Sequence, residues 1–158
     1  MTLKPTATTN TRLKHRRSDF STLWEALDYA AGGDTGFNFY TAKGDLANVL
    51  TYAELRDRAR DLAKRFAGIG LERGSRVVLV ADTDPDFVTA FFATQYAGLL
   101  PVPVAIPTSL GGKEAYIGQL RQQLSGCEAS LAIAPQSLMG FLGEAAQGLP
   151  HLDRKSVV

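Results

Sequence analysis

The chain has 158 residues, which suits one ordinary domain and can bury a hydrophobic core without disulfides or metal. Hydrophobic residues make up 45% of it and charged residues 21%, and no apolar run is long enough to span a bilayer, so we expect a cytoplasmic globular protein without a transmembrane segment. One cysteine and two histidines exclude an internal disulfide and argue against structural zinc or a histidine-dependent nucleophile. We interpret Cys127 as a small, buried or half-buried side chain.

The net charge of +1 is unevenly distributed along the chain. Five of the 17 lysines and arginines precede the first acidic residue, Asp19, which leaves 12 against 16 acidic residues in the rest of the chain. We predict that residues 1–18 form a disordered basic arm. A transit peptide and a nucleic-acid-binding arm are the alternatives for this composition.

A first helix is predicted after Thr22, because Thr22 and Glu25 have the spacing of a capping box. Its apolar stripe consists of Leu23, Ala26, Leu27 and Ala30, and Gly32 and Gly33 follow it. Residues 37–40 and 46–50 then have strand composition and are separated by the turn residues AKGD. This pattern predicts a small hairpin.

A second helix is predicted after Thr51, which forms a capping box with Glu54. Its apolar positions recur every three or four residues: Leu55, Ala59, Leu62, Phe66 and Ile69. The opposite face is charged and is expected to face solvent: Arg56, Asp57, Arg60, Asp61, Lys64 and Arg65. Gly70 ends the helix.

From Arg76 onward, three short apolar segments predict parallel strands, at residues 76–82, 100–106 and 129–134. The first and third are expected to be buried, whereas the prolines of the second suit a strand end or an edge rather than a sheet centre. Asp84 and Pro85 start a helix that is apolar on nearly all sides and is therefore expected to be mostly buried. Two more helices are marked by apolar residues, namely Tyr116, Ile117, Leu120 and Leu124, and then Leu138, Phe141, Leu142 and Ala145. The predicted fold class is α/β: a three-layer parallel-sheet subdomain (β-α-β-α-β-α) preceded by a helix and a small hairpin.

Several short motifs have a composition that could suit a ligand site. The glycines of GIGLERG (68–74) follow a helix rather than a strand, so we interpret them as a cap and a turn. TSLGGK (108–113) and GGDTG (32–36) lack phosphate-loop spacing and are interpreted as solvated connections. The carboxyl end of the first parallel strand carries three aspartates, Asp82, Asp84 and Asp86. We interpret Asp84 as a helix cap, and metal binding by the three carboxylates is the alternative. We predict no metal site.

The run from Leu50 to Pro135 resembles the N-terminal part of the adenylate-forming acyl ligases, a superfamily that includes fatty acyl-AMP ligases and acyl-CoA synthetases. Three collinear segments support the resemblance: LTYAELRDRARDLAKRFAGIGLERGSRVVLV, PDFVTAFFATQYAGLLPVPVAIP and GQLRQQLSGCEASLAIAP. Ser75 replaces the acid that is usual in the first segment. The long connection after Pro103 is more like that of the fatty acyl-AMP ligases than like the short turn of many CoA ligases.

The resemblance implies that the parent enzyme uses ATP and magnesium to convert a fatty acid to acyl-AMP and passes the acyl group to a thiol, on an acyl carrier protein or on CoA. The family's phosphate loop, adenine motif, ribose-binding Asp and catalytic Lys have no counterpart here, so no catalytic residue is assigned and no cofactor is expected on this fragment. The resemblance implies a substrate-channel wall at Pro103, Val104, Ala105, Ile106 and Pro107.

We therefore interpret residues 19–150 as the N-terminal subdomain of an AMP-binding ligase and residues 151–158 as a truncation end or an artificial tail. The fragment itself is predicted to be inactive and to self-associate through the face that truncation leaves open. A stand-alone nucleotide-binding module and a nucleic-acid-binding module that uses the basic arm are the alternatives; the acidic remainder of the chain argues against nucleic acid.

Overall fold

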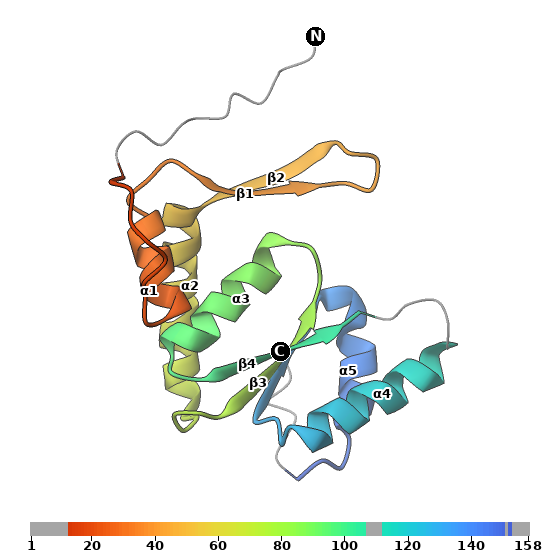
Figure 1. The fold of residues 1–158 in the computed structure, drawn as a ribbon. Helices are drawn as coiled ribbons and strands as arrows, with labels where there is room; N and C mark the ends of the chain where they lie inside the picture. Colours follow the sequence, from red (N-terminus) through yellow and green to blue (C-terminus); the bar gives the residue numbers. More distant parts are fainter. Residues whose placement is uncertain (1–12, 107–111, 151, 153–158) are drawn as a thin grey trace.

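The computed structural model describes residues 13–106, 112–150 and 152 (Figure 1). In chain order the elements are α1 (Leu23–Ala30), β1 (Gly36–Tyr40), β2 (Leu46–Thr51), α2 (Tyr52–Ile69), β3 (Arg76–Ala81), α3 (Pro85–Tyr96), β4 (Leu100–Ala105), α4 (Gly112–Gly126), β5 (Leu131–Ile133) and α5 (Met139–Ala146). A 3₁₀ turn at Gln136–Leu138 precedes α5. The predicted order of a helix, a hairpin and a β-α-β-α-β-α unit is confirmed.

The central sheet has the strand order β4-β3-β5, and both strand pairs are parallel. Successive residues of β3 point to opposite faces, as the pleat requires. Val77 and Leu79 join the core under α2 and α3, whereas Val78 and Val80 join the core under α4 and α5. Figure 1 shows these two helical layers on either side of the sheet. The predicted three-layer architecture is therefore correct.

The helix starts follow from local side-chain hydrogen bonds. The Glu25 and Glu54 amides donate to the hydroxyls of Thr22 (3.3 Å) and Thr51 (3.1 Å), and the Phe87 amide donates to Asp84 (2.7 Å). Each bond satisfies an amide that has no partner within its own helix. All three predicted N-caps are confirmed.

The prolines of β4 lie on its outer edge. The Leu100 amide donates to the Ser75 carbonyl (2.9 Å), so even-numbered residues of β4 direct their backbone groups toward β3. The nitrogens of Pro101 and Pro103 therefore face away from β3, where no hydrogen-bond donor is required. β4 is an edge strand of the described sheet, as its prolines predict.

A separate apolar cluster joins α1, the hairpin and α2 through Leu27, Phe39, Leu50 and Leu55. Gly36 makes the close cross-strand approach possible, because a Cβ at that position would lie 2.1 Å from the Leu50 carbonyl oxygen. The hairpin is antiparallel and projects from the body of the domain (Figure 1).

A network of hydrogen bonds connects α1 to α2 and α3. The Tyr96 hydroxyl donates to Asp28 (2.5 Å), and Arg60 donates to both oxygens of the same carboxylate (3.0 Å each). Burial, with the neighbouring Asp28 as a further cause, raises the pKa of Tyr96. Arg60 is exposed, as predicted for the charged face of α2, and its ion pair with Asp28 is an addition that the sequence pattern did not indicate.

Two expectations about burial are wrong. Ile69 is part of the predicted apolar stripe of α2 but is 46% exposed, because it is the last residue of the helix and lies beyond Phe66, the last of the buried residues of α2. The aromatic residues of α3, such as Phe87 and Phe91, are only half-buried, although the helix was expected to be mostly buried. Within the described parts of the chain, no helix has the length and hydropathy needed to span a membrane.

Candidate functional site

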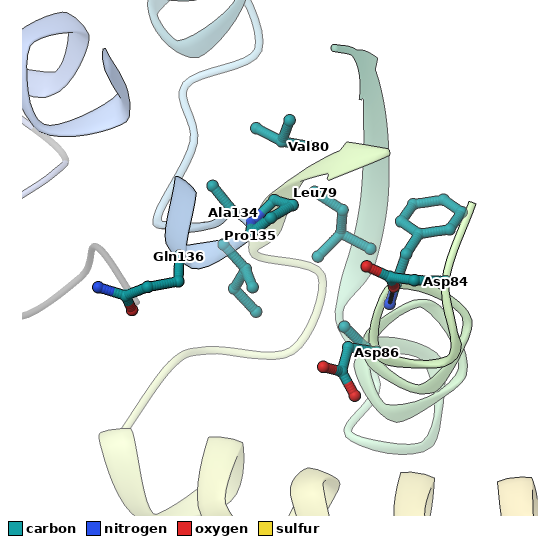
Figure 2. A pocket seen from close by; sticks show the side chains of 10 residues that line it. Leu79, Val80, Asp84, Asp86, Ala134, Pro135 and Gln136 are labelled. Carbon is teal, nitrogen blue, oxygen red and sulfur yellow. Dashed lines mark hydrogen bonds between the residues drawn. The ribbon is translucent and has the colours of Figure 1, made fainter. Parts of the chain in front are cut away.

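A cavity of about 220 Å³ lies at the carboxyl ends of β3 and β5, beside the first turn of α3 (Figure 2). In open α/β sheets this end of the strands is where ligands bind. The lining residues are Leu79, Val80, Asp84, Asp86, Phe87, Ala90, Ile133, Ala134, Pro135 and Gln136. The three aspartates indicate this edge in the sequence, but the cavity was not predicted, because it also needs residues that lie some 50 positions downstream.

The cavity has an apolar interior and a polar rim. Of its lining residues, Leu79, Val80 and Ala90 are buried, whereas Phe87 and Ile133 are half-buried. Asp86 and Gln136 are exposed, and Figure 2 shows them on opposite sides of the opening. Neither side chain has a hydrogen bond or ion pair with another residue that the structure describes.

The three aspartates of this segment do different things. Asp84 accepts the amide of Phe87 and caps α3, as predicted, and Asp82 accepts the amide of Thr83 (2.7 Å). Only Asp86 has a carboxylate without such a bond. Across the described residues, no group of three or more His, Cys, Asp or Glu side chains could hold a metal ion.

The glycine-containing motifs are structural where the structure describes them. Gly70 (φ 81°) caps α2 and Gly74 (φ 83°) turns into β3, as predicted. Within TSLGGK, residues 108–111 lie outside the described residues, and Lys113 forms an ion pair with Glu144 (2.7 Å). That hydrogen bond raises the pKa of Lys113. Its charge is thus compensated by α5 rather than free for a phosphate.

The residues predicted to wall a substrate channel divide into two groups. Pro103, Ala105 and Ile106 are exposed, whereas Val104 is buried between the sheet and α4. Pro107 lies outside the described residues. The Tyr116 hydroxyl donates to the Ala105 carbonyl (3.4 Å) and so supports the carboxyl end of β4.

Cys127 has no feature of a reactive thiol. It is half-buried after α4, its sulfur lies 3.7 Å from the Leu124 carbonyl oxygen, and burial raises the pKa of its thiol. A raised pKa lowers the thiolate fraction that nucleophilic chemistry requires. The structure agrees with the interpretation of Cys127 as a packing residue.

Comparison with known proteins gives a consistent assignment. The family model described as "AMP-binding enzyme" matches residues 32–157. A Caulobacter vibrioides protein named as an acyl-CoA synthetase is 49% identical over 142 residues, which is 90% of this chain and 24% of the relative. A long-chain-fatty-acid–AMP ligase of Mycolicibacterium smegmatis is 29% identical over 112 residues, covering 71% of this chain and 16% of the relative.

Among solved structures, one from a study of fatty acyl-adenylate ligases of E. coli and L. pneumophila superimposes with a TM-score of 0.84 and 39% identity. The match covers 90% of this chain and 25% of that structure. The chain therefore spans about a quarter of the length of the Caulobacter relative and of this structure, and 16% of the Mycolicibacterium ligase.

Proposed function

Because the chain belongs to the AMP-binding enzyme family, we propose that it forms the N-terminal scaffold of a ligase that activates a fatty acid as acyl-AMP and transfers the acyl group to a thiol. The observation that carries the proposal is the 39% identical match, over 90% of the chain, to a structure from the study of fatty acyl-adenylate ligases. This match supports the fatty acyl-AMP ligase type, whereas the 49% identical Caulobacter relative is named as an acyl-CoA synthetase. The proposed acceptor is accordingly the phosphopantetheine thiol of a carrier protein, with CoA as the alternative.

We propose that this chain contributes to the reaction by forming part of the wall of a substrate channel. Ile106 exposes 41% of its surface at the carboxyl end of β4, beside Pro103 and Ala105, and together they offer apolar atoms for a channel wall. Val104 supports this wall from within the core rather than lining it. In a chimeric ligase, with this chain in place of the homologous quarter of an active relative, Ile106→Ala should change the dependence of KM on acyl chain length. An unchanged profile would remove Ile106 from the wall.

The described residues do not fit ATP or magnesium by themselves. Lys113 is paired with Glu144, the caps of α1, α2 and α3 are occupied by side chains, and the aspartates do not gather into a metal site. We therefore propose that nucleotide binding depends on the remaining part of such a ligase and that this chain alone is inactive. Fatty-acid-dependent exchange of pyrophosphate into ATP by the isolated chain would contradict this proposal.

Two rival functions are distinguished by binding measurements on the same chain. A stand-alone nucleotide-binding module would show saturable amide shifts with ATP or NAD. A nucleic-acid module would bind DNA or RNA with an affinity that falls steeply with salt. We expect neither nucleotide binding nor nucleic-acid binding by this chain. A cytoplasmic location remains a prediction.

Self-association of the isolated chain is a further part of the proposal. Pro101 and Pro103 leave the outer edge of β4 poor in donors, which disfavours strand addition there. Exposed apolar side chains on the hairpin, Leu46 and Val49, are the better contact surface. Light scattering at about 100 µM, where a contact of roughly −6 to −8 kcal/mol is populated, should detect dimers. A clean monomer would contradict the proposal.

A further inference from the structure

We propose that the cavity at the carboxyl ends of β3 and β5 binds an organic monocation, namely a primary ammonium group on a short apolar stem. The proposal rests on the cavity's own residues and does not depend on the ligase function. It assigns the apolar interior to the stem and the Asp86 carboxylate to the ammonium group.

The interior has the size and surface for a short alkyl chain or a ring. Its volume is about 220 Å³, and an apolar protein cavity of about 150 Å³ is known to hold benzene. Four of its lining residues contribute apolar side chains, namely Leu79, Ala90, Phe87 and Ile133. An apolar stem that enters the cavity therefore leaves water at a favourable free energy.

The charges at the opening select the sign of the ligand. The ten lining residues include two aspartates and no lysine, arginine or histidine. One oxygen of Asp84 is already engaged by the cap of α3, so Asp86 is the carboxylate that remains for a ligand. Figure 2 shows Gln136 on the other side of the opening with its side chain directed away from Asp86, so the Asp86 carboxylate is the partner that we assign to the ammonium group.

The same arrangement disfavours other classes of ligand. A carboxylate or phosphate would face Asp86 and Asp84 without a cationic partner. A divalent metal needs several convergent oxygen ligands, whereas the described residues contain no such group. An uncharged apolar molecule would fill the interior but leave Asp86 unpaired, which costs the affinity that the ion pair supplies.

The test is a titration of the isotope-labelled full chain with four small probes, followed by amide chemical shifts. The probes are pentylammonium, methylammonium, pentanol and pentanoate, which separate the contribution of the stem from that of the charge. We expect pentylammonium to bind most tightly, with shifts at Phe87 and Gln136. Each methylene that enters the cavity should tighten binding about fourfold. A peptide with one lysine is an additional probe: if it binds as well as pentylammonium, the source of the ammonium group is a protein side chain, and if it does not, the source is a free amine.

Matched variants test the role of the carboxylate. Asp86→Asn should weaken pentylammonium binding about fivefold, which is the upper end for a partly exposed ion pair. Asp34→Asn makes the same change at an exposed residue outside the cavity and should leave the affinity unchanged. Because Asp86 is exposed, neither variant should impair folding, which near-wild-type amide spectra would verify. The proposal is overturned by equal effects of the two variants, by pentanoate binding as well as pentylammonium, or by no saturable shifts at the cavity.

Discussion

The network of hydrogen bonds between α1, α2 and α3 allows a sharp prediction for Tyr96→Phe. The substitution removes only the hydroxyl, which donates to Asp28 (2.5 Å) and makes a longer contact with the Trp24 carbonyl oxygen (3.4 Å). The ring contact with Trp24 (5.9 Å between centroids) and the position of the Arg60 guanidinium over the ring (5.4 Å) are kept. Asp28 also keeps both hydrogen bonds from Arg60, so no buried charge is left without a partner.

The expected loss follows from the environment of the bond. A hydrogen bond to a charged group contributes about 1.5–3 kcal/mol to stability. The Asp28 side chain is 29% exposed, so solvent screening places the value at the lower end, about 1.5 kcal/mol. For a chain of this length, that loss lowers the Tm by roughly 3–6 °C.

Urea unfolding of the wild type, Tyr96→Phe, Asp28→Ala and the double variant measures the coupling between the two side chains. Tyr40→Phe is the matched control, because Tyr40 is 53% exposed and no hydrogen bond of its hydroxyl is found among the described residues. We expect a coupling free energy of about 1 kcal/mol. The conclusion that this network stabilises the packing of α1 would be refuted if Tyr96→Phe had the same free energy of unfolding as Tyr40→Phe. A coupling free energy near zero would refute it as well.

The remaining predictions concern caps, glycines and pH. Thr51→Ala should lower the free energy of unfolding by about 1 kcal/mol with the fold intact, and an unchanged urea midpoint would disprove the cap. Gly36→Ala should lower the free energy of unfolding by at least about 2 kcal/mol, because its Cβ would clash with the Leu50 carbonyl. Gly68→Ala should raise it by about 0.5–1 kcal/mol, because this position in α2 has open space around it. The reverse order of stability would contradict the hairpin register. Because the folded state raises the pKa of Tyr96, the stability it contributes is fully present below the unfolded value of about 10 and is lost as pH rises toward the folded value. The wild type should therefore lose more stability between pH values of about 9 and 11 than Tyr96→Phe does, and identical slopes would argue against the raised pKa.

The features that sequence analysis predicted correctly are those set within a few residues. Thr51 caps α2 through an amide three positions along, and Gly70 ends the same helix by adopting a positive φ. Alternation within β3 follows from the pleat, so its burial on both faces could be inferred from a β-branched run. Such signals need no knowledge of the partner elements.

The features that were missed depend on residues far apart in the chain. The bond from Tyr96 to Asp28 joins residues 68 positions apart, and no local pattern distinguishes Asp28 from other exposed acids of a helix. The half-burial of Phe87 was missed for the same reason, since Phe87 lines a cavity whose other wall is formed at the end of β5, by residues such as Ile133. The exposure of Ile69 shows that an apolar stripe can extend one residue beyond the surface it covers.

The central claim is that this chain is the N-terminal scaffold of a fatty acid-activating ligase, and the chimeric ligase tests it most directly. The homologous quarter of the Caulobacter relative, which is 49% identical over 142 residues, would be replaced by this chain. The measurement is fatty-acid-dependent exchange of labelled pyrophosphate into ATP. The account predicts exchange by the chimera and none by this chain alone. A chimera that is folded by circular dichroism and still fails to exchange, while the parent relative exchanges under the same conditions, would contradict it.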